Sequence, residues 1–131
     1  MSFWETVKHF KPEEFASGDE IGSGKRISHL LVRMLDDLRE KMGEPIHITS
    51  GVRTEARNEE LVSAGKGAVK DSAHLKGLAV DILCPDSSYR FVLVSKALES
   101  GFLRIGVGNR IVHLDLDPAK PQAVIWLYGK T

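Results

Sequence analysis

Ser72-Ala73-His74-Leu75-Lys76-Gly77-Leu78-Ala79-Val80-Asp81 is the stretch that decides the fold, and Val112-His113-Leu114-Asp115 completes it much later in the chain. Two imidazoles and a carboxylate, here those of His74, Asp81 and His113, are a usual ligand set for a catalytic zinc ion that keeps its fourth position for water. Zinc–ligand bonds are about 2 Å long, so the sequence predicts that these side chains converge on one point.

The backbone between His74 and Asp81 has to turn for this to happen. A helix would place the two side chains about 10 Å apart along its axis. A straight strand would place them roughly 23 Å apart and on opposite faces, because their separation is odd. Lys76-Gly77 is where the chain permits a turn. Residues 78–83 then form an apolar strand interrupted only by Asp81, whose carboxylate is costly to bury unless it is paired or bound to a metal.

Ser-x-His-x-x-Gly-x-Ala-x-Asp, followed by His-x-Asp in a late strand, resembles the zinc D-alanyl-D-alanine carboxypeptidases and their murein endopeptidase relatives. These enzymes belong with the hedgehog-like metallopeptidases. Residues 48–54, Ile-Thr-Ser-Gly-Val-Arg-Thr, are similar to the family's strand-to-turn segment that carries an arginine, and the resemblance extends from about Phe10 to Trp126. It implies a metallopeptidase that hydrolyses peptidoglycan stem peptides or cross-links through a zinc-activated water. Carboxypeptidase and endopeptidase activity require the same metal core, so the bond that is cut stays open.

The resemblance also implies roles for two residues outside the ligand set. Arg53 is similar to the cation that binds a substrate carboxylate or carbonyl oxygen near the metal, and a guanidinium suits either role. Without the resemblance, Arg53 would be interpreted as a solvated side chain or as one that forms a salt bridge with Glu55 or Glu59. Ser72 resembles a serine that hydrogen-bonds near the bound peptide, with a local turn-capping hydroxyl as the alternative.

The general base is an open question in this sequence. Many of the family's better-known members carry an acid three positions before the second histidine, where this chain has Arg110. Asp115 is the obvious substitute because it shares a strand face with His113. The rival interpretation is that Asp115 accepts a hydrogen bond from a ligating histidine and fixes its tautomer.

Three functional classes are therefore considered. The first and favoured is an active zinc peptidase. The second is a non-catalytic, zinc-stabilised binding module of the same fold, which Arg110 alone favours. The third is a structural protein without a metal, which leaves the carboxylate of Asp81 in an apolar strand unexplained. Zinc is the expected ion, although a set of two histidines and a carboxylate also takes Fe(II) or Mn(II).

Hydrophobic periodicity predicts three helices. The longest is expected over residues 24–42, with Ser23 as a candidate cap, and the others over 55–64, capped by Thr54, and from Ser87 or Ser88 to about residue 100. The buried stripe of the first is expected at Ile27, Leu30, Leu31, Met34, Leu35, Leu38 and Met42. On the last, the residues expected to face inward are Phe91, Val92, Val94, Ala97 and Leu98.

The fold class expected is α+β: a small, mainly antiparallel sheet with helices on one face and the metal cleft on the other, as in hedgehog and DD-peptidase-like proteins. Strands are expected over residues 46–49, 78–83, 104–107, 110–116 and 123–128. Gly108-Asn109 predicts a hairpin between the third and fourth of these. Residues 1–131 are expected to form one zinc-peptidase-like domain, with an N-terminal arm over about residues 1–20 that packs on the core.

The amino-acid composition limits the classes of partner that the protein is expected to bind. The chain has 18 basic and 18 acidic residues and a formal net charge of zero, which argues against a nucleic-acid partner. A peptidoglycan peptide is the expected partner, and the protein is expected to be a monomer. The single cysteine, Cys84, excludes an internal disulfide.

The expected place of action is the cell wall, yet the sequence shows neither an apolar run of 18 residues nor the pattern of a signal peptide. The chain is then either a processed form or a protein released from the cytoplasm by another route. A phage-encoded lysis or virion enzyme would fit the second case.

Overall fold

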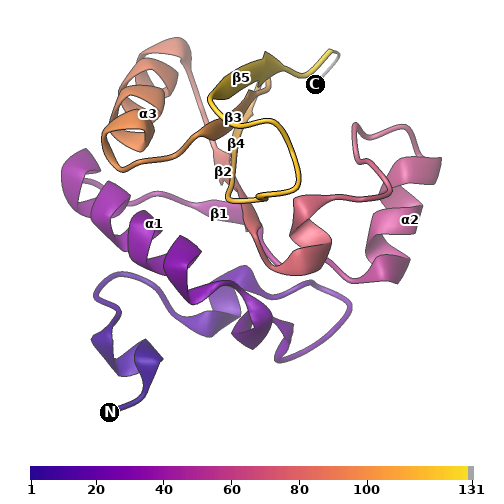
Figure 1. The fold of residues 1–131 in the computed structure, drawn as a ribbon, viewed down its shortest axis with the longest axis horizontal. Helices are drawn as coiled ribbons and strands as arrows, with labels where there is room; N and C mark the ends of the chain where they lie inside the picture. Colours follow the sequence, from indigo (N-terminus) through magenta and orange to yellow (C-terminus); the bar gives the residue numbers. More distant parts are fainter. Residues whose placement is uncertain (130–131) are drawn as a thin grey trace.

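The computed structural model describes residues 1–129 and has the predicted α+β architecture (Figure 1). Its helices are α1 (His29–Met42), α2 (Glu55–Ser63) and α3 (Ser87–Glu99). Short 3₁₀ turns are η1 (Phe3–Thr6), η2 (Pro12–Phe15), η3 (Ser23–Arg26) and η4 (Ala73–Lys76). The strands are β1 (Ile48–Ser50), β2 (Ala79–Leu83), β3 (Arg104–Val107), β4 (Ile111–Asp115) and β5 (Val124–Leu127).

The five strands form one sheet in the order β1-β2-β4-β3-β5. All neighbouring pairs are antiparallel except β3 and β5. The expected hairpin is β3–β4, and β2, the strand that carries Asp81, pairs with β4 on its other side. The two halves of the sequence motif therefore occupy adjacent strands at the centre of the sheet.

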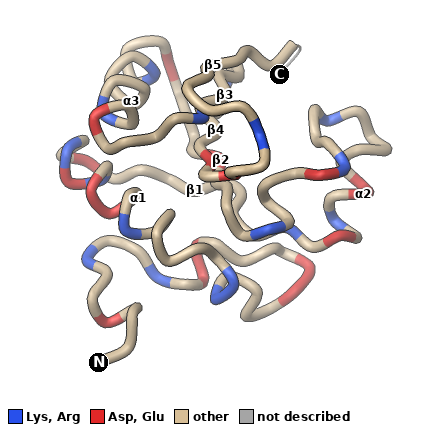
Figure 2. The backbone as a smooth tube through the Cα atoms, in the orientation of Figure 1, with Lys and Arg blue, Asp and Glu red and all other residues tan. Residues whose placement is uncertain are grey.

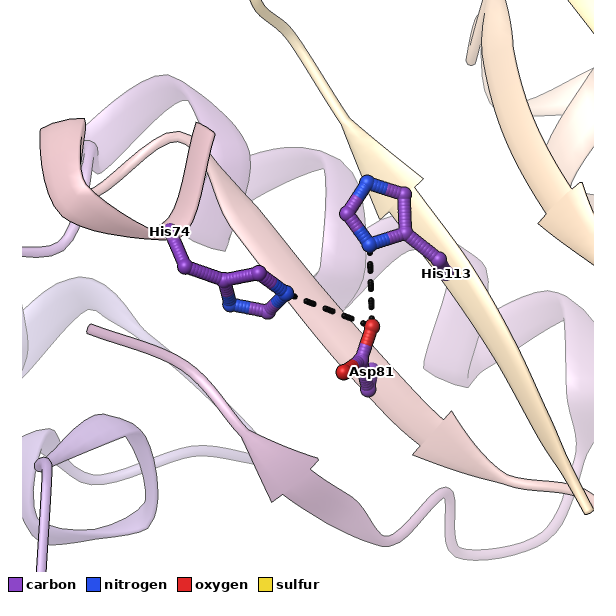
Figure 3. A group of neighbouring side chains, drawn as sticks. All are labelled: His74, Asp81 and His113. Atoms are coloured by element: carbon purple, nitrogen blue, oxygen red, sulfur yellow. Dashed lines mark hydrogen bonds and ion pairs between the residues drawn. The ribbon is translucent and has the colours of Figure 1, made fainter. Parts of the chain in front are cut away.

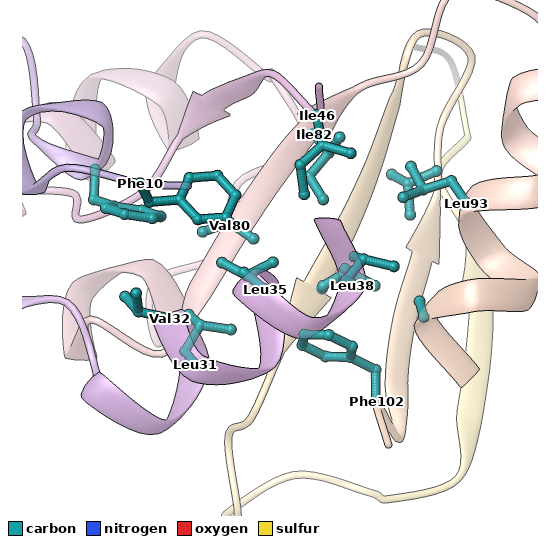
Figure 4. Packing of buried hydrophobic residues seen from close by; sticks show 14 of the residues in the cluster. Phe10, Leu31, Val32, Leu35, Leu38, Ile46, Val80, Ile82, Leu93 and Phe102 are labelled. Atoms are coloured by element: carbon teal, nitrogen blue, oxygen red, sulfur yellow. The ribbon is translucent and has the colours of Figure 1, made fainter. Parts of the chain in front are cut away.

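One face of the sheet is closed by α1 and α3 (Figure 4). Alternate residues of β2 and β4, Val80 and Ile82 on the first and Val112 and Leu114 on the second, are fully buried in this core. The residues between them point to the opposite face, because side chains alternate along a strand. The core side chains therefore dictate that Asp81 and His113 face away from α1. The other helix, α2, borders the cleft on that opposite side.

The longest helix begins later than the sequence predicted. Residues 23–26 form the separate turn η3, and α1 starts at His29 with Ser28 as its cap, accepting a hydrogen bond from the Leu31 backbone N–H at 3.2 Å. The backbone N–H of Ser28 donates to the Gly77 carbonyl at 2.7 Å, which holds Ser28 out of the helix. Ser23 accepts instead from the Ser17 backbone.

The inward faces of α1 and α3 also differ in part from the prediction. Leu30 is exposed, whereas Leu31, Val32, Leu35 and Leu38 make the buried stripe of α1. On α3, Phe91, Val92 and Leu98 are exposed, and the buried residues are Leu93 and Ala97. Asp86, rather than a serine, caps α3 by accepting from the Tyr89 backbone N–H at 2.8 Å. Each of these helices packs against the sheet on one side, so one row of its side chains is enough to fill the contact with the sheet.

The N-terminal segment packs on the core as expected. Phe10 and Phe15 are buried, and the Phe15 carbonyl accepts a hydrogen bond from the Val52 backbone N–H at 2.7 Å. Cys84 is likewise buried in the core. Within residues 1–129, none of the helices combines the length and apolar character that crossing a membrane requires.

Gly77 occupies the turn that brings η4 back to the sheet, and two constraints act on it. Its φ is +69°, a conformation that favours glycine, and a Cβ there would lie 2.4 Å from the Arg26 carbonyl oxygen. The loop that carries His74 is thus packed directly against the segment leading into α1.

Gly77→Ala is expected to lower the free energy of unfolding by about 2–4 kcal/mol, the sum of left-handed backbone strain and a forced backbone displacement. Gly43→Ala is the matched control, because Gly43 has φ +70° but open space around its Cβ position. It should cost only about 1–2 kcal/mol. Urea unfolding of both variants measures the difference, and equal losses would contradict the packing argument.

Candidate metal centre

The turn that carries His74 is built from local hydrogen bonds. Ser72 caps η4, its hydroxyl accepting from the His74 backbone N–H at 3.2 Å, and Gly77 ends it in the left-handed conformation. The backbone N–H of Arg53 donates to the His74 carbonyl at 3.1 Å. These contacts press the turn against the loop between β1 and α2, and they place the His74 side chain over β2.

Asp81 and His113 are brought together by strand register. They are direct partners across the β2–β4 pair, and both point to the face opposite the helical core. Side chains directly opposite one another on antiparallel strands are about 5 Å apart at their Cβ atoms. The sheet therefore supplies two members of the cluster, and the η4 turn supplies the third.

The three side chains meet around a common point (Figure 3). One ligand atom from each lies within 4.8 Å of the others. Asp81 Oδ1 is 3.3 Å from His74 Nε2 and 2.9 Å from His113 Nδ1. In a tetrahedral site with zinc bonds of about 2.0–2.2 Å, ligand atoms are separated by about 3.4 Å. The donor set and its spacing therefore fit a zinc ion after small side-chain shifts.

The second nitrogen of each imidazole is also engaged. His74 Nδ1 lies 2.7 Å from the Gly51 carbonyl oxygen, so it must carry the proton and donate. His113 Nε2 lies 2.6 Å from Asp115 Oδ2. Both contacts leave the remaining nitrogen, Nε2 of His74 and Nδ1 of His113, directed at Asp81. Such outer partners orient a metal-ligating histidine and set its tautomer.

The electrostatics keep the Asp81 carboxylate ionised. Burial favours its protonated form, but attraction to His74 and hydrogen bonds with both histidines outweigh burial and hold the pKa of Asp81 well below its usual range. Burial also opposes the charged form of His113, yet hydrogen bonds to Asp115 and Asp81 raise its pKa. A cation that binds here therefore competes with a proton on His113.

Arg53 lies beside the cluster with its guanidinium largely buried. It donates to Asn58 Oδ1 at 3.1 Å and makes longer contacts with the hydroxyls of Ser72 and Ser50, while Asp81 Oδ2 is 3.9 Å away. Burial lowers the pKa of Arg53, and the nearby Asp81 partly offsets this. A buried cation held mainly by neutral groups retains the capacity to bind an anion.

A cleft of about 1110 Å³ contains the cluster and Arg53. Trp126 from β5 and Tyr128, directly after this strand, form an aromatic wall on one side, with ring centroids 5.5 and 6.3 Å from that of His113. Burial raises the pKa of Tyr128 to about 12, so its hydroxyl stays protonated at neutral pH. From the sequence alone, Trp126 could equally be a pocket wall or a core or edge tryptophan, and Tyr128 was assigned no role.

Two polar residues near the site gave only weak sequence signals. Asn58 accepts from Arg53 and donates to the Val69 carbonyl at 2.9 Å, which ties α2 to the loop before His74. Arg104 is buried and pairs with Asp115. A charged residue at the start of the apolar strand of residues 104–107 was the available signal for Arg104, by reasoning similar to that which singled out Asp81.

Charged residues of both signs are interspersed along α1, α2 and α3 (Figure 2). Arg110, at the position where an acid was sought, is exposed at the cleft rim. The structure thus brings together His74, Asp81 and His113, sets Arg53 and Ser72 beside them, and joins Asp115 to the outer nitrogen of His113.

Comparison with known proteins identifies a family and a similar fold for this chain. No match was found among curated proteins. Among solved structures, the L-Ala D-Glu endopeptidase ChiX of Serratia marcescens is similar, with a TM-score of 0.54 and 24% sequence identity over 71% of this chain and 82% of that one. At this identity the likeness establishes the fold. Residues 8–115, most of the chain and all of the candidate centre, match the family described as Peptidase M15. The chain therefore belongs to the Peptidase M15 family, the zinc DD-peptidase-like group that its histidine and aspartate motifs resemble.

Proposed function

We propose that this protein is a zinc-dependent peptidase that hydrolyses peptidoglycan stem peptides or cross-links. The observation that carries the proposal is the convergence of His74, Asp81 and His113, with ligand atoms within 4.8 Å of one another, inside a cleft that Arg53 also lines. Membership of a peptidase family supports the reaction class. The identity of the metal as zinc and the choice of substrate are what the proposal adds to family membership.

The name of the structural neighbour suggests which bond to test first. ChiX is described as an L-Ala D-Glu endopeptidase, and murein stem peptides contain this linkage. Removal of a terminal D-alanine and cleavage of a D,D cross-link are the alternative reactions. All of them need the same ligand cluster and differ in how the cleft holds the peptide on either side of it.

His74, Asp81 and His113 would hold the ion through Nε2, a carboxylate oxygen and Nδ1, the atoms that already face one another. A bound zinc ion would polarise the scissile carbonyl and lower the pKa of a water molecule toward neutrality. The histidine ligands are pre-oriented by Gly51 and Asp115 and so need little rearrangement.

Arg53 is proposed to bind a carboxylate or the carbonyl oxygen of the substrate. Its guanidinium is buried beside the cluster and retains donor capacity, since its hydrogen bonds go to neutral side chains. In a site shielded from water, such a donor stabilises developing negative charge strongly. Ser72 caps the η4 turn and accepts from Arg53, so its proposed contribution to substrate binding would be made beside this cation.

Asp115 has contacts that favour the orienting role over the role of general base. Its Oδ2 lies against His113 Nε2, and its Oδ1 accepts from Arg104 at 2.7 Å. A carboxylate with both oxygens engaged is poorly placed to collect a proton from an attacking water. We therefore propose that Asp115 holds the His113 tautomer.

His74→Ala is expected to lose bound zinc and all cleavage of purified sacculi, because one of three protein ligands is removed. The measurements are metal content and chromatography of released peptides, whose masses also identify the bond. His47→Ala, an exposed histidine outside the cleft, is the matched control and should retain both properties. Cleavage by the His74 variant would exclude the mechanism. Zinc bound without cleavage of any stem peptide by the wild type would indicate the binding-module alternative.

Asp115→Asn separates the two roles of this residue. If it orients His113, zinc affinity should fall about 10-fold to 100-fold, because the amide is a weaker acceptor for the ring N–H. If it is instead the general base, turnover should fall by roughly two to four orders of magnitude with zinc fully bound. Zinc titration and single-turnover cleavage at saturating metal distinguish these outcomes.

Arg53→Lys should lower kcat/KM for stem-peptide cleavage about 100-fold without loss of zinc, since lysine keeps the charge but loses the planar fork. Steady-state kinetics with parallel metal analysis test this. Arg33→Lys, on α1 and outside the cleft, serves as the control. An unchanged kcat/KM in the Arg53 variant would remove its proposed role.

A further inference from the structure

Arg104 is a buried cation that the proposed chemistry does not yet use. It stands on β3, one strand beyond His113, and its side chain is held from three directions. Nε donates to Asp115 Oδ1 at 2.7 Å, and Nη1 donates to the Pro121 carbonyl at 2.6 Å. The guanidinium carbon also lies 4.7 Å from the centroid of the Trp126 ring. These contacts fix the plane of the guanidinium.

The Asp115 carboxylate is in turn held in one orientation. Its Oδ1 accepts from Arg104 and, at 3.0 Å, from the backbone N–H of Asp117. Its Oδ2 remains for His113 Nε2 at 2.6 Å. Two donors on one oxygen determine where the other oxygen points. The direction in which the His113 ring points Nδ1 at Asp81 therefore depends, through Asp115, on Arg104 and on the backbone N–H of Asp117.

We propose that Arg104 is a positioning residue for the metal centre, which acts through Asp115 to hold the His113 ring in its ligating orientation. This inference rests on the proposed function, in that His113 is taken as a metal ligand. In the described part of the chain, the hydrogen bonds of Arg104 go to Asp115 and Pro121 rather than to the three candidate ligands. Its effect on metal binding would be transmitted through the Asp115 carboxylate.

The geometry explains why an arginine stands here. A guanidinium donates along two directions in one plane and can stack on an aromatic ring at the same time. A lysine ammonium at this position would keep the charge but could not hold Asp115, Pro121 and Trp126 in a fixed mutual arrangement. A salt bridge that served only stability would need the charge pair and would be indifferent to the orientation of the second carboxylate oxygen.

Gly106 makes the contact between the Arg104 guanidinium and the Trp126 ring possible. It lies across from His113 on one side and from Trp126 on the other. A Cβ on Gly106 would approach Trp126 Cε2 and Tyr128 Cε2 to 2.8 Å. The missing side chain thus lets both rings fold over the sheet toward His113. Trp126 consequently forms the cleft wall and one side of the Arg104 site with the same ring.

The test is a double-mutant cycle on zinc affinity, measured by competition with a chromophoric chelator on the purified, metal-stripped full chain. Arg104→Lys and Asp115→Asn should each weaken zinc binding about 10-fold to 100-fold. In the Asp115→Asn background, Arg104→Lys should add less than about 3-fold, because its effect passes through the same carboxylate. Arg33→Lys is the control, since Arg33 also lies over an aromatic ring, that of Phe3, but on α1. It should leave zinc affinity unchanged.

Trp126→Leu is a second route to the same result if Arg104→Lys does not fold. Trp126 is only partly buried on an edge strand. Losing its contact with the guanidinium should weaken zinc binding about 3-fold to 10-fold. That loss should again disappear in the Asp115→Asn background.

Unchanged zinc affinity in Arg104→Lys, or losses that multiply fully with those of Asp115→Asn, would overturn the positioning role. Thermal unfolding of the metal-free variants identifies a purely structural role, which would lower Tm and leave the affinity of the folded protein intact. A wild-type protein that binds no zinc would instead contradict the proposed function itself.

Discussion

The pairing of Asp81 with His113 across the two central strands is the constraint on which the rest of the structure depends. A carboxylate on an apolar strand is stable in the interior only with compensating partners, and two imidazoles provide them here. The register that sets Asp81 opposite His113 also commits Val80, Ile82, Val112 and Leu114 to the other face. A slip of one residue would exchange the faces and bury the polar set against α1.

The remaining elements serve that pairing from two sides. On the core side, α1 and α3 cover the sheet and give it the apolar burial that a domain of this size needs. On the cleft side, the η4 turn lowers His74 onto Asp81, and the loop before α2 receives its outer nitrogen at Gly51. Beyond His113, Asp115 and Arg104 continue the contacts to β5. Each of the three side chains of the candidate centre is therefore held by a backbone or side-chain partner on a neighbouring element.

The predictions from sequence match the structure best where the residue type allows only one local conformation. Gly77 had to turn the chain, Thr54 caps α2, and Gly108-Asn109 lies between β3 and β4. Agreement is weaker where several residues satisfy the same rule. Ser23 and Ser28 are both suitable caps, and the Ser28–Gly77 hydrogen bond, 49 positions apart in sequence, selects the second. Leu30 and Phe91 fit a helical stripe, yet they lie outside the contact that α1 and α3 make with the sheet.

The sequence by itself determined the candidate ligand set, the turn between His74 and Asp81, the shared face of His113 and Asp115, and the α+β class, because each follows from local spacing and strand or helix period. Only the tertiary structure decided that Arg53 lies beside Asp81, that Asp115 takes the outer nitrogen of His113, and that Arg104 and Trp126 support it. These contacts join residues on different strands and loops. Their partners are selected by sheet order and packing, which periodicity along the chain does not encode.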